Sequence, residues 1–297
     1  MTSLRLLAAV AVLLTGCAGT ATRTAAPAAS PVTASTPATT TPPATAATPA
    51  TAAAATSPPP RPVVPAWVVG ASPLPRGSGG FGKVLPTPRA LRDRHLQAVD
   101  VLPPPADGAF HAWVGPITAA LLVQMGETYR PGCPVGPAAL RHLTLVFRGF
   151  DGRVHTGELV VAAAAAPQVV AIFRRLFALG FPIEQMRLPT TADLTAAPTG
   201  DGNDTAAFVC RTARGQTRYS AHAYGLAIDV NPFQNPFVRG DLVLPELAGS
   251  YTDRGRLRAG MFEPGSAAVR AFTREGWTWG GTFSRPKDYQ HFSLTGD

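Results

Sequence analysis

The sequence predicts an α+β fold, with a mainly antiparallel sheet flanked by helices and preceded by a disordered linker. Two observations support this prediction. Beyond residue 76, segments with strand and helix patterns follow one another without regular alternation, which favours antiparallel pairing. Residues 18–75 instead consist largely of Ala, Thr, Pro and Ser, and such a composition cannot bury a core. About 220 residues remain, enough for one domain, which we expect to span residues 76–297.

The N-terminus predicts export. Residues 4–16 form an apolar run that contains Arg5 and is too short to span a bilayer, as is typical of a signal peptide. The sequence LTGC at residues 14–17 resembles the lipobox of bacterial lipoproteins, in which cleavage leaves a lipidated cysteine. We therefore expect a lipoprotein signal peptide at residues 1–17 and a lipid anchor on Cys17. The alternative is an ordinary signal peptide with an incidental cysteine.

The linker and the net charge bear on location and partners. Proline keeps residues 18–75 extended, so this segment is expected to act as a semi-rigid spacer between the membrane and the folded domain. Three of the 26 basic residues and none of the 18 acidic residues precede residue 76, which leaves a net charge of about +5 on the domain. No basic stripe is interleaved with aromatic residues, so nucleic acid is not expected as a partner. An anionic polymer fits better.

The cysteines predict a disulfide. Once Cys17 is set aside, Cys133 and Cys210 form an even pair in an exported chain, and an oxidising compartment favours a bond between them. Metal binding by either cysteine is the weaker alternative, because no CxxC or CxxH spacing surrounds them.

The first half of the expected domain leads into a hairpin. Apolar residues recur at helical spacing over residues 87–102, and a turn with a short helix is expected over residues 113–125. Residues 140–148 and 153–161 both alternate between apolar and polar side chains, and the sequence GFDG between them predicts a tight turn. We expect these two segments to pair as strands.

The second half predicts two helices and three short strands. Proline at the start and apolar residues at helical spacing predict a helix over residues 167–179, and residues 266–275 follow a similar pattern. The expected strands are apolar: 181–186, 226–230 and 289–294. Two further segments, 190–203 and 232–257, are expected to be irregular.

Four side chains in this half form a candidate metal site. Asp229 follows His222 by seven positions, and His291 has Asp288 three positions before it. Two imidazoles and a carboxylate suit a catalytic zinc ion, because three protein ligands leave a fourth position open to water. The second carboxylate can then take a proton from that water. The spacing alone is weak, since a hydrogen-bonded loop histidine and an acid paired with an arginine would fit the same residues.

Longer motifs favour the metal interpretation. Residues 220–229, SAHAYGLAID, match the pattern S-x-H-x-x-G-x-A-x-D, and GWTWGG and DYQHF follow near the C-terminus. Together with RPGCPVG, GFDGRVHTGELVV and NDTAAFVCR, these motifs resemble the zinc peptidoglycan peptidases in the extended form found in exported actinobacterial proteins. This family contains D-alanyl-D-alanine carboxypeptidases (VanY-like) and L-alanyl-D-glutamate endopeptidases. The resemblance covers residues 126–293 and implies a DD-peptidase/hedgehog-like fold.

The resemblance implies a site and an activity. His222, Asp229 and His291 are expected to bind Zn²⁺, and Asp288 is expected to act as general base in hydrolysis of peptidoglycan stem peptides. The implied role is D-alanyl-D-alanine carboxypeptidase in cell-wall remodelling, by a monomer anchored to the outer face of the membrane and extending into the wall. The alternatives are L-alanyl-D-glutamate endopeptidase and a non-catalytic cell-wall-binding lipoprotein of the same fold.

The family also uses an arginine upstream of the first histidine, to bind a substrate carboxylate or to stabilise the oxyanion. Arg211, beside Cys210, is the first candidate, and Arg187 is the second. Either could instead be a surface or structural arginine. Ser220 is expected to form hydrogen bonds near the metal or to position substrate, unless the tight loop simply requires a small residue.

The remaining aromatic residues and histidines carry weaker expectations. Trp277 and Trp279 could line a groove, but alternating aromatics near a strand are more often core. Four histidines have no acidic or cysteine partner at ligand spacing, so we expect no site at His95, His111, His142 or His155. The sequence contains no Gly-rich phosphate loop and no G-x-S-x-G motif, which gives nucleotide binding and serine hydrolysis no support.

Overall fold

The structure, a computed structural model, describes residues 67–213 and 216–296. All of them belong to the second of two compact units, residues 61–297. The expected signal peptide, Cys17 and most of the expected linker lie outside the described residues. Within the described part of the chain, no helix combines the length and apolarity that crossing a membrane requires.

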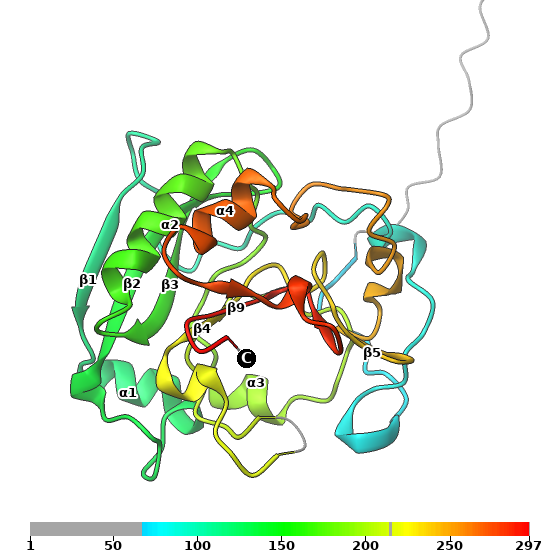
Figure 1. The fold of residues 1–297 in the computed structure, drawn as a ribbon, viewed down its shortest axis with the longest axis horizontal. Helices are drawn as coiled ribbons and strands as arrows, with labels where there is room; N and C mark the ends of the chain where they lie inside the picture. The colour runs from blue at the N-terminus through cyan, green and yellow to red at the C-terminus, as the bar shows by residue number, and fades with distance from the viewer. Residues whose placement is uncertain (1–66, 214–215, 297) are drawn as a thin grey trace, which may run out of the picture. The chain divides into compact units, whose positions relative to one another are not determined.

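The expected α+β fold is confirmed, because every strand pairing in its three sheets is antiparallel (Figure 1). The strand orders are β1-β2-β3, β4-β9-β7 and β6-β5-β8. The strands are β1 Ala112–Pro116, β2 Leu140–Arg148, β3 Val154–Ala162, β4 Ala227–Asp229, β5 Phe237–Arg239, β6 Leu242–Leu244, β7 Thr278–Trp279, β8 Lys287–Asp288 and β9 His291–Ser293. The α-helices are α1 Ala119–Met125, α2 Ala166–Ala178, α3 Thr191–Thr195 and α4 Ala267–Thr273.

The expected hairpin forms the long pair of the first sheet. β2 pairs with β3 over its whole length, and Gly152, with a φ of 76°, occupies the left-handed region in the turn between them. The expected helix at residues 167–179 is also confirmed, as α2. Its buried residues recur at the spacing of one helix face and pack in the main core with β2 and β3: Val169, Ile172, Phe173 and Leu176.

The second sheet joins this core. Its middle strand, β9, pairs with β4 on one side and β7 on the other, and α4 packs against both α2 and β7. α4 begins where the Ser266 side chain accepts a hydrogen bond from the Val269 amide, as a helix N-cap does. Both tryptophans of the GWTWGG motif are almost fully buried here, so Trp277 and Trp279 are core residues.

The domain begins earlier than residue 76. Trp67 donates a hydrogen bond from Nε1 to Asp201, and Gly70 donates its amide to the same buried carboxylate. Trp67 and Leu74 also pack against a second core cluster with buried residues such as Phe233. The linker boundary at residue 75 therefore has to be corrected, because residues 67–75 make contacts that composition alone does not reveal.

Five expected elements differ, and two of them are segments that were expected to be irregular: residues 190–203 contain α3, and residues 232–257 contain β5 and β6. Residues 87–102 contain only one short helix, the 3₁₀ helix Arg89–Leu91. Apolar side chains of this segment pack individually into the second core cluster, and this packing replaces a longer helix. Residues 112–116 form the edge strand β1, where the sequence predicts a turn. Residues 181–186 form isolated β-bridges rather than a strand, at Pro182 and Gln185.

Candidate metal centre

His222 is positioned by a short helix that two small residues define. The 3₁₀ helix Ala221–Tyr224 begins at Ser220, whose side chain accepts the His222 amide at 3.4 Å. It ends at Gly225, which has a φ of 68°. A Cβ atom on Gly225 would lie 2.4 Å from the Ala162 nitrogen, so only glycine allows this helix to pack against the end of β3.

Asp229 and His291 come from neighbouring strands. β4 and β9 are antiparallel, and their register places Asp229 directly opposite His291. Cross-strand partners project toward the same face of a sheet. The pairing therefore brings together two side chains that are 62 positions apart in the sequence.

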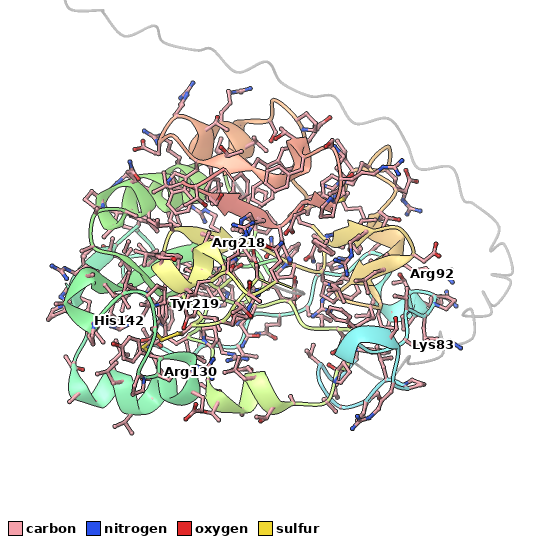
Figure 2. All side chains as sticks on the ribbon, turned by 60° about the horizontal axis from the view of Figure 1, so that its bottom comes forward. Lys83, Arg92, Arg130, His142, Arg218 and Tyr219 are labelled. Atoms are coloured by element: carbon pink, nitrogen blue, oxygen red, sulfur yellow. A yellow bond between two sulfur atoms is a disulfide. The ribbon has the colours of Figure 1, made fainter. Side chains whose placement is uncertain are left out.

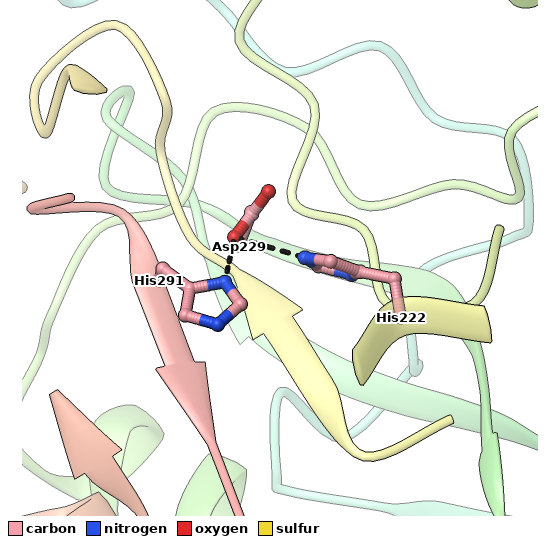
Figure 3. A group of neighbouring side chains, drawn as sticks. All are labelled: His222, Asp229 and His291. Carbon is pink, nitrogen blue, oxygen red and sulfur yellow. Dashed lines mark hydrogen bonds and ion pairs between the residues drawn. The ribbon is translucent and has the colours of Figure 1, made fainter. Parts of the chain in front are cut away.

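The three side chains converge on one point (Figure 3). His222 Nε2 lies 3.3 Å from Asp229 Oδ1, and His291 Nδ1 lies 3.0 Å from the same oxygen. One potential ligand atom from each residue lies within 4.8 Å of the others. Both histidines are buried, whereas the Asp229 side chain keeps 22% of its surface exposed. The cluster thus has an open side at the carboxylate.

The environment fixes the charge of the cluster. Burial alone would raise the pKa of Asp229, but the adjacent His222 and His291 hold that pKa well below its usual range. His222 Nδ1 lies 2.5 Å from the Ala207 carbonyl oxygen, which can only accept a hydrogen bond. Nδ1 therefore carries a proton, which leaves Nε2 as the ring nitrogen that faces Asp229. No sequence signal identifies a backbone acceptor such as Ala207.

Asp288 lies next to the cluster. Partial burial, followed by the negative charge of Asp229, raises the pKa of Asp288 to about 7, against the opposing effects of His291 and Arg211. Among the described residues, no group donates a hydrogen bond to its buried Oδ1 atom. A carboxyl group with a pKa near neutrality suits proton transfer at physiological pH.

The two candidate arginines lie in different surroundings. Arg187 forms an ion pair with Asp193, in which Nη2 and Oδ1 lie 2.5 Å apart. Its guanidinium also donates hydrogen bonds to neighbouring residues, so its donors are occupied locally. The hydrogen bonds that Arg187 donates to Asp193 raise the pKa of Arg187. Arg211 is close enough to Asp288 to lower the pKa of that carboxyl. Of the two candidates, Arg211 is therefore the one whose charge affects Asp288.

The segment that carries Arg211 is held at both sides. The expected disulfide is confirmed between Cys133 and Cys210, with Cα atoms 5.7 Å apart. Tyr219 donates a hydrogen bond from its hydroxyl to the Gly132 carbonyl at 2.6 Å, on the loop that also carries Arg130 (Figure 2). The Ser220 amide donates to the Arg211 carbonyl. These bonds tie Arg211 to the helix of His222.

The other histidines correct one expectation. Three of them have carboxylate partners: Asp107 for His111, Glu158 for His142, and Asp100 and Asp151 for His155. Asp107 and Asp151 each precede their histidine by four positions, a spacing that the sequence does show, whereas Glu158 and Asp100 are brought close only by the fold. None of these histidines belongs to a group of three or more metal-binding side chains within the described residues.

Comparison with known proteins points to the same segment. The model of a family described as D-alanyl-D-alanine carboxypeptidase matches residues 214–294, which include His222, Asp229, Asp288 and His291. Neither the curated proteins nor the solved structures include a match to the chain. The matched segment also carries the motifs SAHAYGLAID, GWTWGG and DYQHF. Residues 214–294 are therefore similar to a family of D-alanyl-D-alanine carboxypeptidases, which supports the resemblance inferred from the motifs.

Proposed function

We propose that the protein is a zinc-dependent D-alanyl-D-alanine carboxypeptidase that trims peptidoglycan stem peptides during cell-wall remodelling. The observation that carries this proposal is the convergence of His222, Asp229 and His291 beside an additional carboxyl group, Asp288. A binding protein would need neither that second acid nor its raised pKa. We further propose a lipid anchor at Cys17, which would hold the enzyme at the outer face of the membrane.

The donor set fits a zinc ion. Two imidazole nitrogens and one carboxylate oxygen are the ligands that three-residue catalytic zinc sites use. The hydrogen bond from His222 Nδ1 to the Ala207 carbonyl fixes the orientation of the ring and leaves Nε2 as the atom that can bind the metal. Asp229 is anionic, because His222 and His291 hold its pKa low. A bound cation would take the place of the protons that lie between these histidines and the carboxylate.

The protein's residues would then divide the work of hydrolysis. A zinc ion held by the three ligands supplies a water of lowered pKa and polarises the scissile carbonyl. Asp288 accepts the proton from the attacking water and returns it to the leaving amine. Burial and the charge of Asp229 raise the pKa of Asp288 in the metal-free protein, which helps this carboxyl group to hold the proton between the two transfers.

Arg211 is the proposed electrostatic partner of the substrate. Its guanidinium acts on Asp288 through space, and the only hydrogen bond described for its side chain goes to the carbonyl of the adjacent Thr212. It can therefore bind a substrate carboxylate or the oxyanion that forms during attack. Ser220 is assigned a supporting role, because its hydroxyl caps the helix that carries His222.

Digestion of stem peptides tests the proposal. The purified chain, loaded with zinc or treated with a chelator, is incubated with pentapeptide muropeptides, and the products are identified by mass spectrometry. Zinc-dependent loss of the terminal alanine supports the proposal. Cleavage between L-alanine and D-glutamate would replace it with the endopeptidase alternative. Zinc binding without any cleavage would favour the non-catalytic wall-binding alternative.

A further inference from the structure

The strand that carries Asp288 lies against a glycine. A Cβ atom built on Gly280 would lie 2.4 Å from the Asp288 carbonyl oxygen, 2.9 Å from its Cβ and 3.2 Å from its carbonyl carbon. Two of these neighbours are backbone atoms of β8, which cannot rotate away as the end of a side chain can. The φ of Gly280 lies outside the left-handed region, so the backbone itself would accept alanine there. The requirement for glycine at this position comes from Asp288.

Trp279, which precedes Gly280, holds the backbone of Tyr289, the residue after Asp288. Trp279 donates a hydrogen bond from Nε1 to the Tyr289 carbonyl at 2.8 Å, and its ring is almost fully buried. A Cβ atom on Gly281 would lie 2.3 Å from that ring, so Gly281 leaves the space that the indole occupies. The sequence Trp-Gly-Gly thus builds one supporting surface for residues 288–289.

Two further contacts hold the same residues from the other side. β5 pairs with β8 in a register that places Phe237 opposite Asp288. The Arg254 guanidinium lies over the Tyr289 ring, 4.4 Å from its centre, and also donates to the Gln234 carbonyl. Asp288 is therefore held between the Trp-Gly-Gly segment and residues 234–254.

We propose that Gly280 and Trp279 are positioning residues for Asp288, which set the distance of its carboxyl group from the metal cluster. An aspartate side chain is one methylene shorter than a glutamate, so it has little freedom to compensate for a shifted backbone. A misplacement of about 1 Å at a catalytic group can cost on the order of a hundredfold in rate. The inference rests on the proposed function, because it concerns the proposed general base.

Glycine-to-alanine substitutions at two sites test this role. The variant Gly280→Ala is compared with Gly136→Ala, a matched control whose φ is −83° and whose added Cβ would meet no atom within 4 Å. We expect Gly280→Ala to lower kcat about 10-fold to 100-fold, with KM and zinc affinity within about threefold of the parent values. Gly136→Ala should match the parent. Unchanged kcat in folded Gly280→Ala would overturn the proposal.

A crystal structure of metal-free Gly280→Ala provides a readout that does not depend on activity. We expect Asp288 to move away from Gly280 while Asp229 and His291 keep their positions. An unmoved Asp288 would refute the positioning role even if the parent enzyme proved inactive. Failure of the parent to hydrolyse stem peptides would instead count against the proposed function, so the two failures are distinguishable.

The variant Trp279→Phe covers the case in which Gly280→Ala does not fold. It keeps an aromatic ring in the core and removes the hydrogen bond to the Tyr289 carbonyl. We expect kcat to fall about 3-fold to 10-fold with zinc affinity unchanged, since one neutral hydrogen bond is worth about 1 kcal/mol. Equal loss of zinc affinity and kcat would indicate general damage to the site and would overturn the proposal.

Discussion

Two groups of charged side chains in this molecule differ in how their polar atoms are satisfied. Arg94 is fully buried, and its guanidinium donates to both oxygens of Glu184 and to the Asp201 carbonyl. Asn203 donates a further hydrogen bond to Glu184. In the metal centre, both histidines instead approach a single oxygen of Asp229, and Asp288 Oδ1 receives no hydrogen bond from the described residues.

The difference separates a structural group from a reactive one. A buried ion pair whose donors and acceptors are all matched gains nothing from an additional ligand. A cluster with excess negative charge and unmatched acceptors is stabilised by a cation or a proton, and such groups occur mainly at functional sites. Substitutions in the Arg94 group should therefore change stability, whereas substitutions in the metal centre should change binding and rate.

The largest effect is expected for His222→Ala. This variant removes one of three ligands, so we expect zinc content and peptidase activity to fall together below detection. Zinc is measured by mass spectrometry of the purified protein, and activity by release of alanine from pentapeptides. Circular dichroism checks that the variant remains folded. Full activity with bound zinc in this variant would remove the basis for the site.

Asp288→Asn should separate binding from turnover. The amide cannot accept the proton, so we expect kcat to fall about a hundredfold to ten-thousandfold while zinc remains bound. The comparison with His222→Ala is decisive, because zinc is lost in one variant and kept in the other. Parent-like turnover by Asp288→Asn would mean that another group serves as base.

The pH dependence of the parent enzyme should report the same residue. Burial and the charge of Asp229 raise the pKa of Asp288 to about 7 in the metal-free protein, and a bound cation would lower that pKa by neutralising Asp229. The base is active when deprotonated. We therefore expect kcat/KM to fall as the pH drops through a value at or below about 7, and an acid limb well above that value would contradict the assignment.

Arg94→Met tests the structural group. It leaves the Glu184 carboxylate buried without its charged partner, so we expect the free energy of unfolding to fall by about 3 kcal/mol, as measured with denaturant. Glu184→Gln in the same background should recover part of the loss, because no unpaired charge remains. The kcat of the folded fraction should equal that of the parent. A loss of kcat without a loss of stability would show that the two groups are coupled.

The sequence predicted elements with strong local patterns and missed those that depend on distant contacts. The hairpin of β2 and β3 and the helix α2 were predicted because alternation and helical spacing persist over a whole element. Residues 87–102 have helical spacing, but their apolar side chains pack against residues 233–261, and this tertiary packing overrides the local pattern. The same contacts explain why residues 67–75 belong to the domain.

The candidate site was predictable in the residues that form the cluster and not in their supporting contacts. His222, Asp229 and His291 lie in motifs, and strand pairing brings them together. The Ala207 carbonyl is a backbone group that any residue could supply. The Trp-Gly-Gly sequence was visible, but the contact between Gly280 and Asp288 depends on the way two short segments pack. Spacing also could not choose between Arg187 and Arg211, because the choice depends on the partner Asp193.

The smallest effects are expected for substitution of Arg187. Comparing this variant with the same substitution at Arg211 tests whether the interaction partner of each arginine determines its effect on activity. Arg211→Gln removes the charge that acts on Asp288, and we expect kcat/KM to fall about a hundredfold with zinc retained. Arg187→Gln should leave kcat/KM within about threefold. It should lower the free energy of unfolding by less than about 1 kcal/mol, since the ion pair with Asp193 is partly exposed and screened by solvent.

The pH dependence of that small loss identifies its cause. Burial alone would raise the pKa of Asp193, but Arg187 and Thr190 lower that pKa from 3.8 to about 2. A lowered pKa means that the folded state favours the carboxylate, so the stabilisation is present above about pH 4 and disappears as the pH falls toward 2. Parent and Arg187→Gln should therefore converge in stability in acid. If Arg187→Gln instead lost as much kcat/KM as Arg211→Gln, the assignment of the substrate arginine would have to be reversed.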